Sequence, residues 1–234
     1  MARYRRILLK LSGEAVAGPD GRGFSPERAG ALACEVAEVT RAGVQLGIVI
    51  GGGNFIRGVA AREVRRVTAD TMGMLATVIN ALALADALEA AGAAARVLSA
   101  IEMPRIAEPH SAARALRHLE KGRVVVFAGG TSNPYVSTDT AAALRALEIQ
   151  AELLAKGTRV AGVFDKDPEQ HRDAVLFREI SFQEVLARGL QVMDAASIAM
   201  CRDNRLPIVV FNLTEPGNIM RISMGEAVGT RIHA

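Results

Sequence analysis

Short apolar runs alternate with amphipathic segments along most of the chain. The apolar runs predict buried strands, and they lie at residues 5–11, 45–50, 95–98, 123–128, 158–163 and 208–212. Apolar positions three or four residues apart predict helices at residues 26–42, 70–91, 111–120, 140–154, 181–188 and 193–204. This alternation is typical of α/β proteins, so we expect a largely parallel central sheet between two helical layers, a three-layer sandwich.

Local signals mark the ends of some of these elements. Ser25 is a good N-cap and Pro26 suits the first position of the helix that follows. The glycine-rich residues 13–23 predict a loop before that helix. The chain has 234 residues without a repeat or a low-complexity linker, so we expect one domain over residues 1–234, with a soft division into two lobes near residue 151.

Composition and charge exclude several classes of function. Hydrophobic residues make up 50% of the chain and charged residues 23%, as in packed soluble domains. The net charge is +3 and the basic residues are spread out, so we expect small anionic substrates and no nucleic acid. Polar residues interrupt the longest apolar region, residues 72–101, so we expect no membrane span. The two cysteines, Cys34 and Cys201, lack metal-ligand spacing and predict buried or idle thiols in a reducing compartment, the cytoplasm.

Three glycine-bearing turns follow predicted strands, at residues 10–13, 51–53 and 129–131. In open α/β sheets, ligands bind at the carboxyl ends of the strands. The phosphate loop GxxxxGK[ST] and the dinucleotide fingerprint GxGxxG are both absent from the sequence. A nucleotide site in this protein must therefore be built from other turns.

The first of these turns contains a lysine. Lys10 interrupts an apolar strand directly before Leu11, Ser12 and Gly13. Burying an ammonium group is costly unless it meets an anion, which favours a ligand-binding lysine. The alternative is a lysine that extends from the strand end to solvent, and this motif alone supports both interpretations equally.

The other two turns are also suited to anions. In the triple-glycine turn, residues 51–53, successive amides can form an anion-binding nest, and Arg57 can bind phosphate; a tight surface turn is the alternative. The double-glycine turn, residues 129–131, leads to hydroxyl and amide side chains at a helix N-terminus, which favours anions. Asp139 and Asp70 can each be a capping or first-turn carboxylate, but their joint placement at strand ends favours a shared site.

Phosphoryl transfer requires such features, because backbone amides and cations must hold several phosphate charges in line. The chain also closely resembles the bacterial uridylate kinases of the amino-acid-kinase superfamily over nearly its whole length. The segments that carry this resemblance are RRILLKLSGEA, VIGGGNFIRG, DTMGMLATVIN, GTSNPYVSTD, GVFDKDP, VMDAASIAMCRDNRLPIVVFN and MGEAVGT. Each segment alone is weakly specific, whereas their order and spacing together are strongly specific.

The resemblance implies an amino-acid-kinase fold with an acceptor-binding N-terminal lobe and an ATP-binding C-terminal lobe, Mg²⁺ carried with ATP, UMP as acceptor and UDP as product. It also implies a homohexamer and no metal ligand in the protein itself. Catalysis is assigned to Lys10, Arg57 and Asp139, with Asp139 orienting Lys10 and the metal-bound phosphates rather than acting as a strong base. The implied ATP-binding residues are Lys10, Leu11, Ser12, Gly13, Gly53, Arg57, Thr158, Phe164 and Asp167. The implied UMP-binding residues are Gly52, Asp70, Thr131, Ser132, Asn133, Pro134, Tyr135, Val136, Ser137 and Thr138.

The sequence departs from the family pattern at a few positions. Ser132 replaces a common glycine, and Tyr135 and Val136 replace a pair of aromatic residues, which bears on the fit to uracil. Ala85 stands where many relatives have an arginine linked to activation by GTP. The response to GTP and UTP as effectors therefore stays open.

Two other functions compete with this interpretation. A kinase of the same superfamily that acts on a carboxylate, such as acetylglutamate or aspartate, shares the lysine and glycine turns but lacks the acceptor segments around Asp70 and Asn133. A non-catalytic nucleotide sensor or storage assembly of the same fold is expected to lose Lys10 or Asp139, and this chain keeps both.

Overall fold

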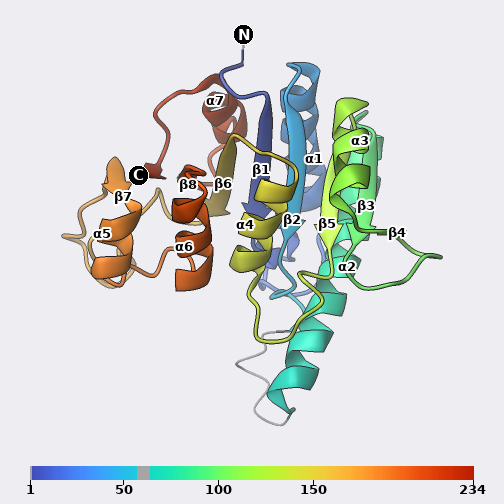
Figure 1. Cartoon of the computed structure of the whole chain (residues 1–234), viewed down its shortest axis with the longest axis horizontal. Helices are drawn as coiled ribbons and strands as arrows, with labels where there is room; N and C mark the ends of the chain where they lie inside the picture. The colour runs from blue at the N-terminus through green and yellow to red at the C-terminus, as the bar shows by residue number, and fades with distance from the viewer. Residues whose placement is uncertain (1, 57–63) are drawn as a thin grey trace.

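The computed structural model describes residues 2–56 and 64–234, and within them the strands form one nine-stranded sheet (Figure 1). The strand order is β4-β3-β5-β2-β1-β6-β8-β9-β7. All neighbouring pairs are parallel except β8 and β9. The strands are β1 (Arg6–Leu11), β2 (Gln45–Ile50), β3 (Ala95–Ser99), β4 (Glu108–Pro109), β5 (Val124–Ala128), β6 (Leu153–Thr158), β7 (Glu179–Ser181), β8 (Ile208–Asn212) and β9 (Thr230–His233).

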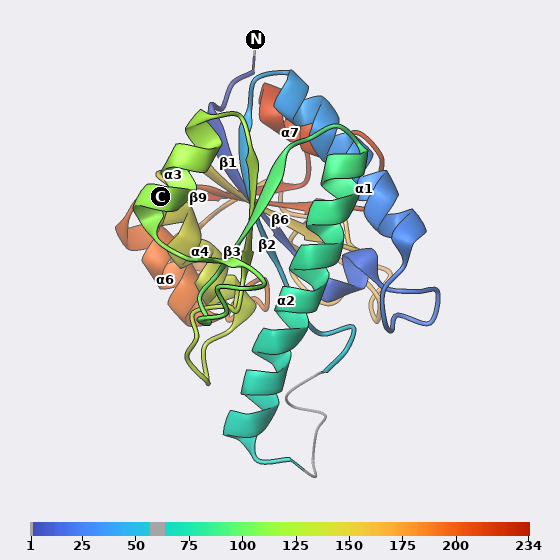
Figure 2. The ribbon, with the colours of Figure 1, turned by 90° about the vertical axis from the view of Figure 1, so that its right-hand side faces the viewer.

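Helices cover both faces of this sheet, which confirms the predicted three-layer sandwich (Figure 2). One face carries α1 (Pro26–Arg41), α2 (Arg66–Ala90) and α7 (Asn218–Met224). The other carries α3 (Ala112–Glu120), α4 (Thr138–Glu148) and α6 (Ala195–Asp203), with α5 (Phe182–Ala187) packed against α6. A short 3-10 helix, η1 (Gly13–Val16), follows β1.

The central strand β1 explains why both faces need cover. All six of its residues are buried. Ile7 and Leu9 belong to the core under α1 and α2, whereas Leu8 belongs to the core under α3, α4 and α6. Successive side chains of a strand point to opposite faces of its sheet. A strand that is apolar at successive positions must therefore be covered on both faces, which places β1 in the middle of the sandwich.

The predicted start of α1 is confirmed, but other boundaries were wrong. Ser25 caps α1 by accepting a hydrogen bond from the Arg28 amide at 3.3 Å, and Pro26 is its first residue. In contrast, α2 begins one turn earlier than predicted, at Arg66 instead of Asp70. Asp70 is therefore not the cap of this helix.

The predicted helix over residues 140–154 and strand over residues 158–163 were also wrong. Helix α4 ends at Glu148, Gln150 takes a positive φ of 54°, and β6 occupies the following residues as far as Thr158. Leu153 and Leu154 look like the end of an apolar helix in the sequence, but they are fully buried in a strand that lies between β1 and β8. The short strands β4, β7 and β9 and helix α7 were not predicted; β4 and β7 form the two edges of the sheet, and β9 lies between β8 and β7.

Within the described residues, α2 is the one helix long and apolar enough to cross a membrane by length and composition. A core helix passes the same test. Leu84 and Leu88 are fully buried against the core under α1, and α2 also contacts β3 and β5. Its packing in this structure is therefore that of a core helix.

Candidate active site

The glycine turns meet at the carboxyl edge of the sheet. Strands β1, β2, β5 and β6 are parallel neighbours, so their carboxyl ends share one edge. The Gly51 amide donates to the Leu11 carbonyl at 2.9 Å, which joins the end of β1 to the triple-glycine turn. A Cβ added to Gly13 would lie 2.2 Å from Asn54 Oδ1, so only glycine allows these two turns to approach this closely.

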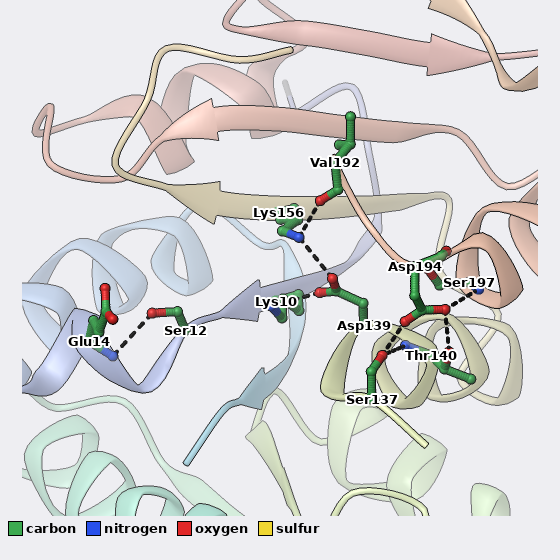
Figure 3. A network of polar contacts seen from close by, with 10 residues as sticks. All are labelled: Lys10, Ser12, Glu14, Ser137, Asp139, Thr140, Lys156, Val192, Asp194 and Ser197. Carbon is green, nitrogen blue, oxygen red and sulfur yellow. Dashed lines mark hydrogen bonds and ion pairs between the residues drawn. The ribbon is translucent and has the colours of Figure 1, made fainter. Parts of the chain in front are cut away.

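Two lysines and one aspartate form a buried ion-pair group at this edge (Figure 3). Lys10 on β1 and Lys156 on β6 are register partners on adjacent strands. Lys10 Nζ lies 2.7 Å from Asp139 Oδ1, and Lys156 Nζ lies 2.9 Å from Asp139 Oδ2. The three side chains are only 10%, 12% and 16% exposed. Lys10 therefore faces the Asp139 carboxylate instead of extending to solvent, which argues against the solvent-exposed interpretation, and its ligand-binding role stays a prediction.

The charges of this group favour a bound anion. Burial by itself would raise the pKa of Asp139, but Lys10 and Lys156 outweigh it and hold the pKa below its usual value. Burial, followed by the charge of Lys10, lowers the pKa of Lys156. With both lysines protonated, these three side chains carry one net positive charge, which the nearby Asp194 carboxylate offsets in part at Lys156. A phosphate group would balance the remaining charge.

Helix capping places Asp139 against the two lysines. Ser137 is the N-cap of α4 and accepts from the Thr140 amide at 3.1 Å, so Asp139 lies in the first turn, as its simpler interpretation predicted. Asp194, the N-cap of α6, accepts from Thr140 Oγ1 at 2.8 Å and also from the Ser137 hydroxyl (Figure 3). These bonds join the N-termini of α4 and α6 and fix the position of the Asp139 carboxylate in the first turn of α4.

Sequence reasoning missed Lys156 and Asp194. Lys156 is one of only four lysines in the chain, which was a weak signal. The misplaced strand hid its pairing with Lys10, because Lys156 stood in a predicted connection and not beside β1. Asp194 precedes α6 as an ordinary N-cap, and only the tertiary structure turns its second oxygen toward α4.

A pocket of about 330 Å³ lies between the glycine turns and α2. Eight residues predicted for nucleotide binding line it: Gly52, Gly53, Asp70, Asn133, Tyr135, Val136, Ser137 and Thr138. Thr131, Ser132 and Pro134 do not line it, although they belong to the same loop. Six further lining residues were not predicted: Ile56, Arg66, Gly73, Met74, Thr77 and Gly130. Arg57 lies outside the described residues.

Asp70 is held at the wall of this pocket as an ionised carboxylate. Arg66 Nε donates to both of its oxygens, at 2.9 and 2.8 Å, and the Tyr135 amide donates to Oδ2 at 2.9 Å. Burial would raise the pKa of Asp70 slightly, but the Tyr135 amide and Arg66 outweigh it and lower the pKa. An ionised carboxylate with free lone pairs is suited to accept hydrogen bonds from the hydroxyl groups of a sugar.

The residues predicted on the adenosine side lie apart from this pocket. Thr158 ends β6 and its hydroxyl donates to the Val160 carbonyl at 2.7 Å. Phe164 forms an isolated antiparallel bridge with Leu176. The exposed Asp167 accepts from the Glu169 amide at 2.9 Å. Thr158 is therefore the last residue of β6, and Phe164 and Asp167 lie in the segment between β6 and β7.

Two of the remaining predicted residues have structural partners. Ser12 caps η1 by accepting from the Glu14 amide at 3.1 Å, and Leu11 is fully buried.

Within residues 2–56 and 64–234, no three His, Cys, Asp or Glu side chains lie close enough together to hold a metal ion.

The fold and the buried lysine–aspartate–lysine group define an α/β protein with a cationic group at the carboxyl edge of its sheet. Residues 5–212 match the profile of the amino acid kinase family, and the chain belongs to this family.

Solved structures of similar proteins cover nearly the whole chain. A UMP kinase from Bacillus anthracis is 39% identical with a TM-score of 0.95, over 98% of this chain and 96% of that one. A UMP kinase from Ureaplasma parvum is 34% identical with a TM-score of 0.93, over 99% of this chain and 100% of that one. A uridylate kinase from Archaeoglobus fulgidus is 28% identical with a TM-score of 0.76, again over 99% and 100%.

Proposed function

We propose that this protein is a UMP kinase, which transfers the γ-phosphoryl group of Mg-ATP to UMP and releases UDP and ADP. The observation that carries the proposal is full-length similarity to UMP kinases, at 39% and 34% identity. The pocket supports it, because Ser137 and Thr138 line it and directly precede Asp139, the carboxylate paired with Lys10 and Lys156.

The chemistry follows from the charges at the sheet edge. An oxygen of the UMP phosphate attacks the γ-phosphorus, and the bond from that phosphorus to the ADP oxygen breaks. The attacking oxygen is already anionic and needs no strong base. Asp139 is held ionised by two ammonium groups, so it positions Lys10 and Lys156, while the lysines stabilise charge on the transferred group.

The pocket holds UMP in this proposal. Its volume of about 330 Å³ falls within the range of small-molecule sites, about 300–1,000 Å³. Asp70 accepts from the ribose hydroxyls, Gly52 approaches the phosphate, and residues 131–138 surround the base and phosphate. Arg66, which holds Asp70, joins this set as a residue that sequence reasoning did not provide.

ATP lies across the neighbouring strand ends. Leu11, Ser12, Gly13, Gly53 and Arg57 face its phosphates, and Thr158, Phe164 and Asp167 line its adenosine. Mg²⁺ enters with ATP as part of the substrate. In this arrangement residues up to about 151 bind the acceptor and the rest bind most of the donor, within a single domain.

Assembly and regulation complete the proposal. The protein acts in the cytoplasm as a homohexamer, and a row of exposed apolar residues on α2 supports assembly through this helix: Met72, Leu75, Ile79 and Leu82. GTP activates it weakly, because Ala85 offers no charge to an anionic effector. Initial rates at subsaturating ATP and UMP test this, and a several-fold rise at micromolar GTP would contradict it.

The acceptor is tested by ADP release with UMP, CMP, dUMP, acetylglutamate and aspartate. We expect UMP to be used far better than dUMP, which lacks the 2′-hydroxyl offered to Asp70, and far better than CMP, whose base differs where residues 131–138 surround it. Lys10→Ala should lower turnover by about 100-fold or more while the chain stays folded. Lys121→Ala, an exposed lysine at the end of α3, is the matched control and should match the wild type. Turnover of acetylglutamate or aspartate in place of UMP, or full activity of folded Lys10→Ala, would refute the proposal.

A further inference from the structure

Helix α2 contacts both the triple-glycine turn and the double-glycine turn through two buried polar side chains. Thr77 and Asn80 are 5% and 0% exposed. Three residues apart, they lie on the same face of the helix, about 4.5 Å from each other along its axis. Polar groups at such buried positions need partners, and here the partners are the backbones of the two turns.

Thr77 holds the double-glycine turn. Its Oγ1 accepts from the Gly129 amide at 2.8 Å and donates to the Met74 carbonyl at 2.7 Å. The hydroxyl proton is therefore used inside the protein, although Thr77 lines the pocket. Gly129 and Gly130 have positive φ values of 74° and 58°, a conformation that glycine adopts without steric cost but does not enforce.

Asn80 holds the triple-glycine turn. Its Nδ2 donates to the Gly51 carbonyl at 2.7 Å and to Asn54 Oδ1 at 2.8 Å. Asn54 Nδ2 returns a bond to Asn80 Oδ1 at 3.0 Å and donates to the Gly23 carbonyl at 2.6 Å. A Cβ on Gly52 would lie 2.6 Å from the Gly73 carbonyl, so the turn also packs directly on the helix.

We propose that Thr77 and Asn80 are positioning residues that fix the distance between the two glycine turns. The consequence for catalysis rests on the proposed function, in which the triple-glycine turn faces both substrates and the double-glycine turn faces the acceptor. Glycine backbones have no side chains of their own to hold them, whereas a continuous helix is rigid. A misplacement of the reacting groups by about 1 Å can cost roughly 100-fold in rate. Binding both turns to one helix therefore keeps the donor and acceptor phosphates aligned for in-line transfer.

Two variants at Thr77 separate positioning from general stability. Thr77→Val keeps the shape and removes both hydrogen bonds, and Thr77→Ser keeps the hydroxyl. We expect Thr77→Val to lower kcat/KM for UMP by about tenfold, the effect of one buried hydrogen bond, with the KM for ATP within about twofold of wild type. Thr77→Ser should restore the wild-type value. Asn80→Ala should instead raise the KM for ATP as well, since the triple-glycine turn faces both substrates.

Leu88→Ala is the control for lost stability, because Leu88 is fully buried in the same helix and lies away from both turns. It should unfold at lower denaturant concentration with unchanged KM values. The proposal would be overturned if Leu88→Ala changed the KM values as Thr77→Val does. It would also be overturned if folded Thr77→Val kept the wild-type kcat and KM.

Amide hydrogen exchange tests positioning without any substrate. Thr77→Val should speed exchange in peptides covering residues 129–131 by about tenfold and leave β6 peptides unchanged. Faster exchange there in a protein that does not phosphorylate UMP would refute the proposed function and keep the positioning role. Unchanged exchange in this turn would overturn the positioning role whatever the substrate.

Discussion

Asp139→Asn tests whether the buried carboxylate holds the two lysines together. The change keeps the shape of the side chain and removes its charge. Lys10 and Lys156 are 10% and 12% exposed and adjacent across β1 and β6, and they would then be two buried cations that have lost their shared ion-pair partner. Removing one partner of a buried pair costs about 3–5 kcal/mol, and we expect the lower end, about 3 kcal/mol, because the amide oxygen still accepts one bond. For a chain of this size that corresponds to a Tm lower by about 6–12 °C.

The assay is urea unfolding at neutral pH, with Asp203→Asn as the matched control. Asp203 pairs with Arg202 at 2.8 Å but is 63% exposed, so its loss should change the free energy of unfolding by no more than about 1 kcal/mol. Pyrophosphate should stabilise Asp139→Asn more than the wild type, since it replaces the missing negative charge. Equal unfolding midpoints for the two variants would refute the ion-pair reasoning.

The pH dependence gives a second readout of the same pair. The folded-state pKa of Asp139 is lowered by Lys10 and Lys156 despite burial, so its contribution is fully present above the usual aspartate pKa of about 3.9. It is lost as the pH falls through the lowered pKa. The difference in unfolding free energy between wild type and Asp139→Asn should therefore stay constant around neutral pH and shrink only below about pH 4. A difference that shrinks between pH 7 and 5 would contradict this.

Three further predictions concern other parts of the molecule. Gly13→Ala should destabilise the protein by about 1–3 kcal/mol in thermal melts and raise the KM for ATP, because its methyl would lie 2.2 Å from Asn54 Oδ1. Gly30→Ala is the control: its methyl would meet open space, and it should stabilise the protein by about 0.5–1 kcal/mol in the same melts. Asp70→Asn should raise the KM for UMP and leave kcat nearly unchanged, and a lost kcat with constant KM would contradict a binding role. A thiol reagent should label only Cys34 in the native protein, because burial raises the pKa of Cys201 to about 12, and labelling of both cysteines before unfolding would contradict that burial.

The sequence determined the fold class and many of its elements. Strand β2 and the capped start of α1 follow from local patterns, because an apolar run needs burial and Ser25-Pro26 satisfies a helix N-terminus. Its motifs also indicated Lys10 and Asp139, and the structure brings those two side chains together. The roles of the proposed substrate-binding residues stay predictions, and Arg57 lies outside the described residues.

Only the tertiary structure decided how separate segments form one site. Lys156 is a partner of Lys10 because β6 pairs with β1, and no local pattern near residue 156 encodes that pairing. In the same way Thr77 and Asn80 look like ordinary interior residues of an apolar helix until two glycine turns pack against them. Periodicity and capping act over a few residues, whereas strand order brings together groups more than a hundred residues apart. The sequence therefore indicated which charged side chains the protein can use for catalysis, and strand pairing determined which of them lie together in one site.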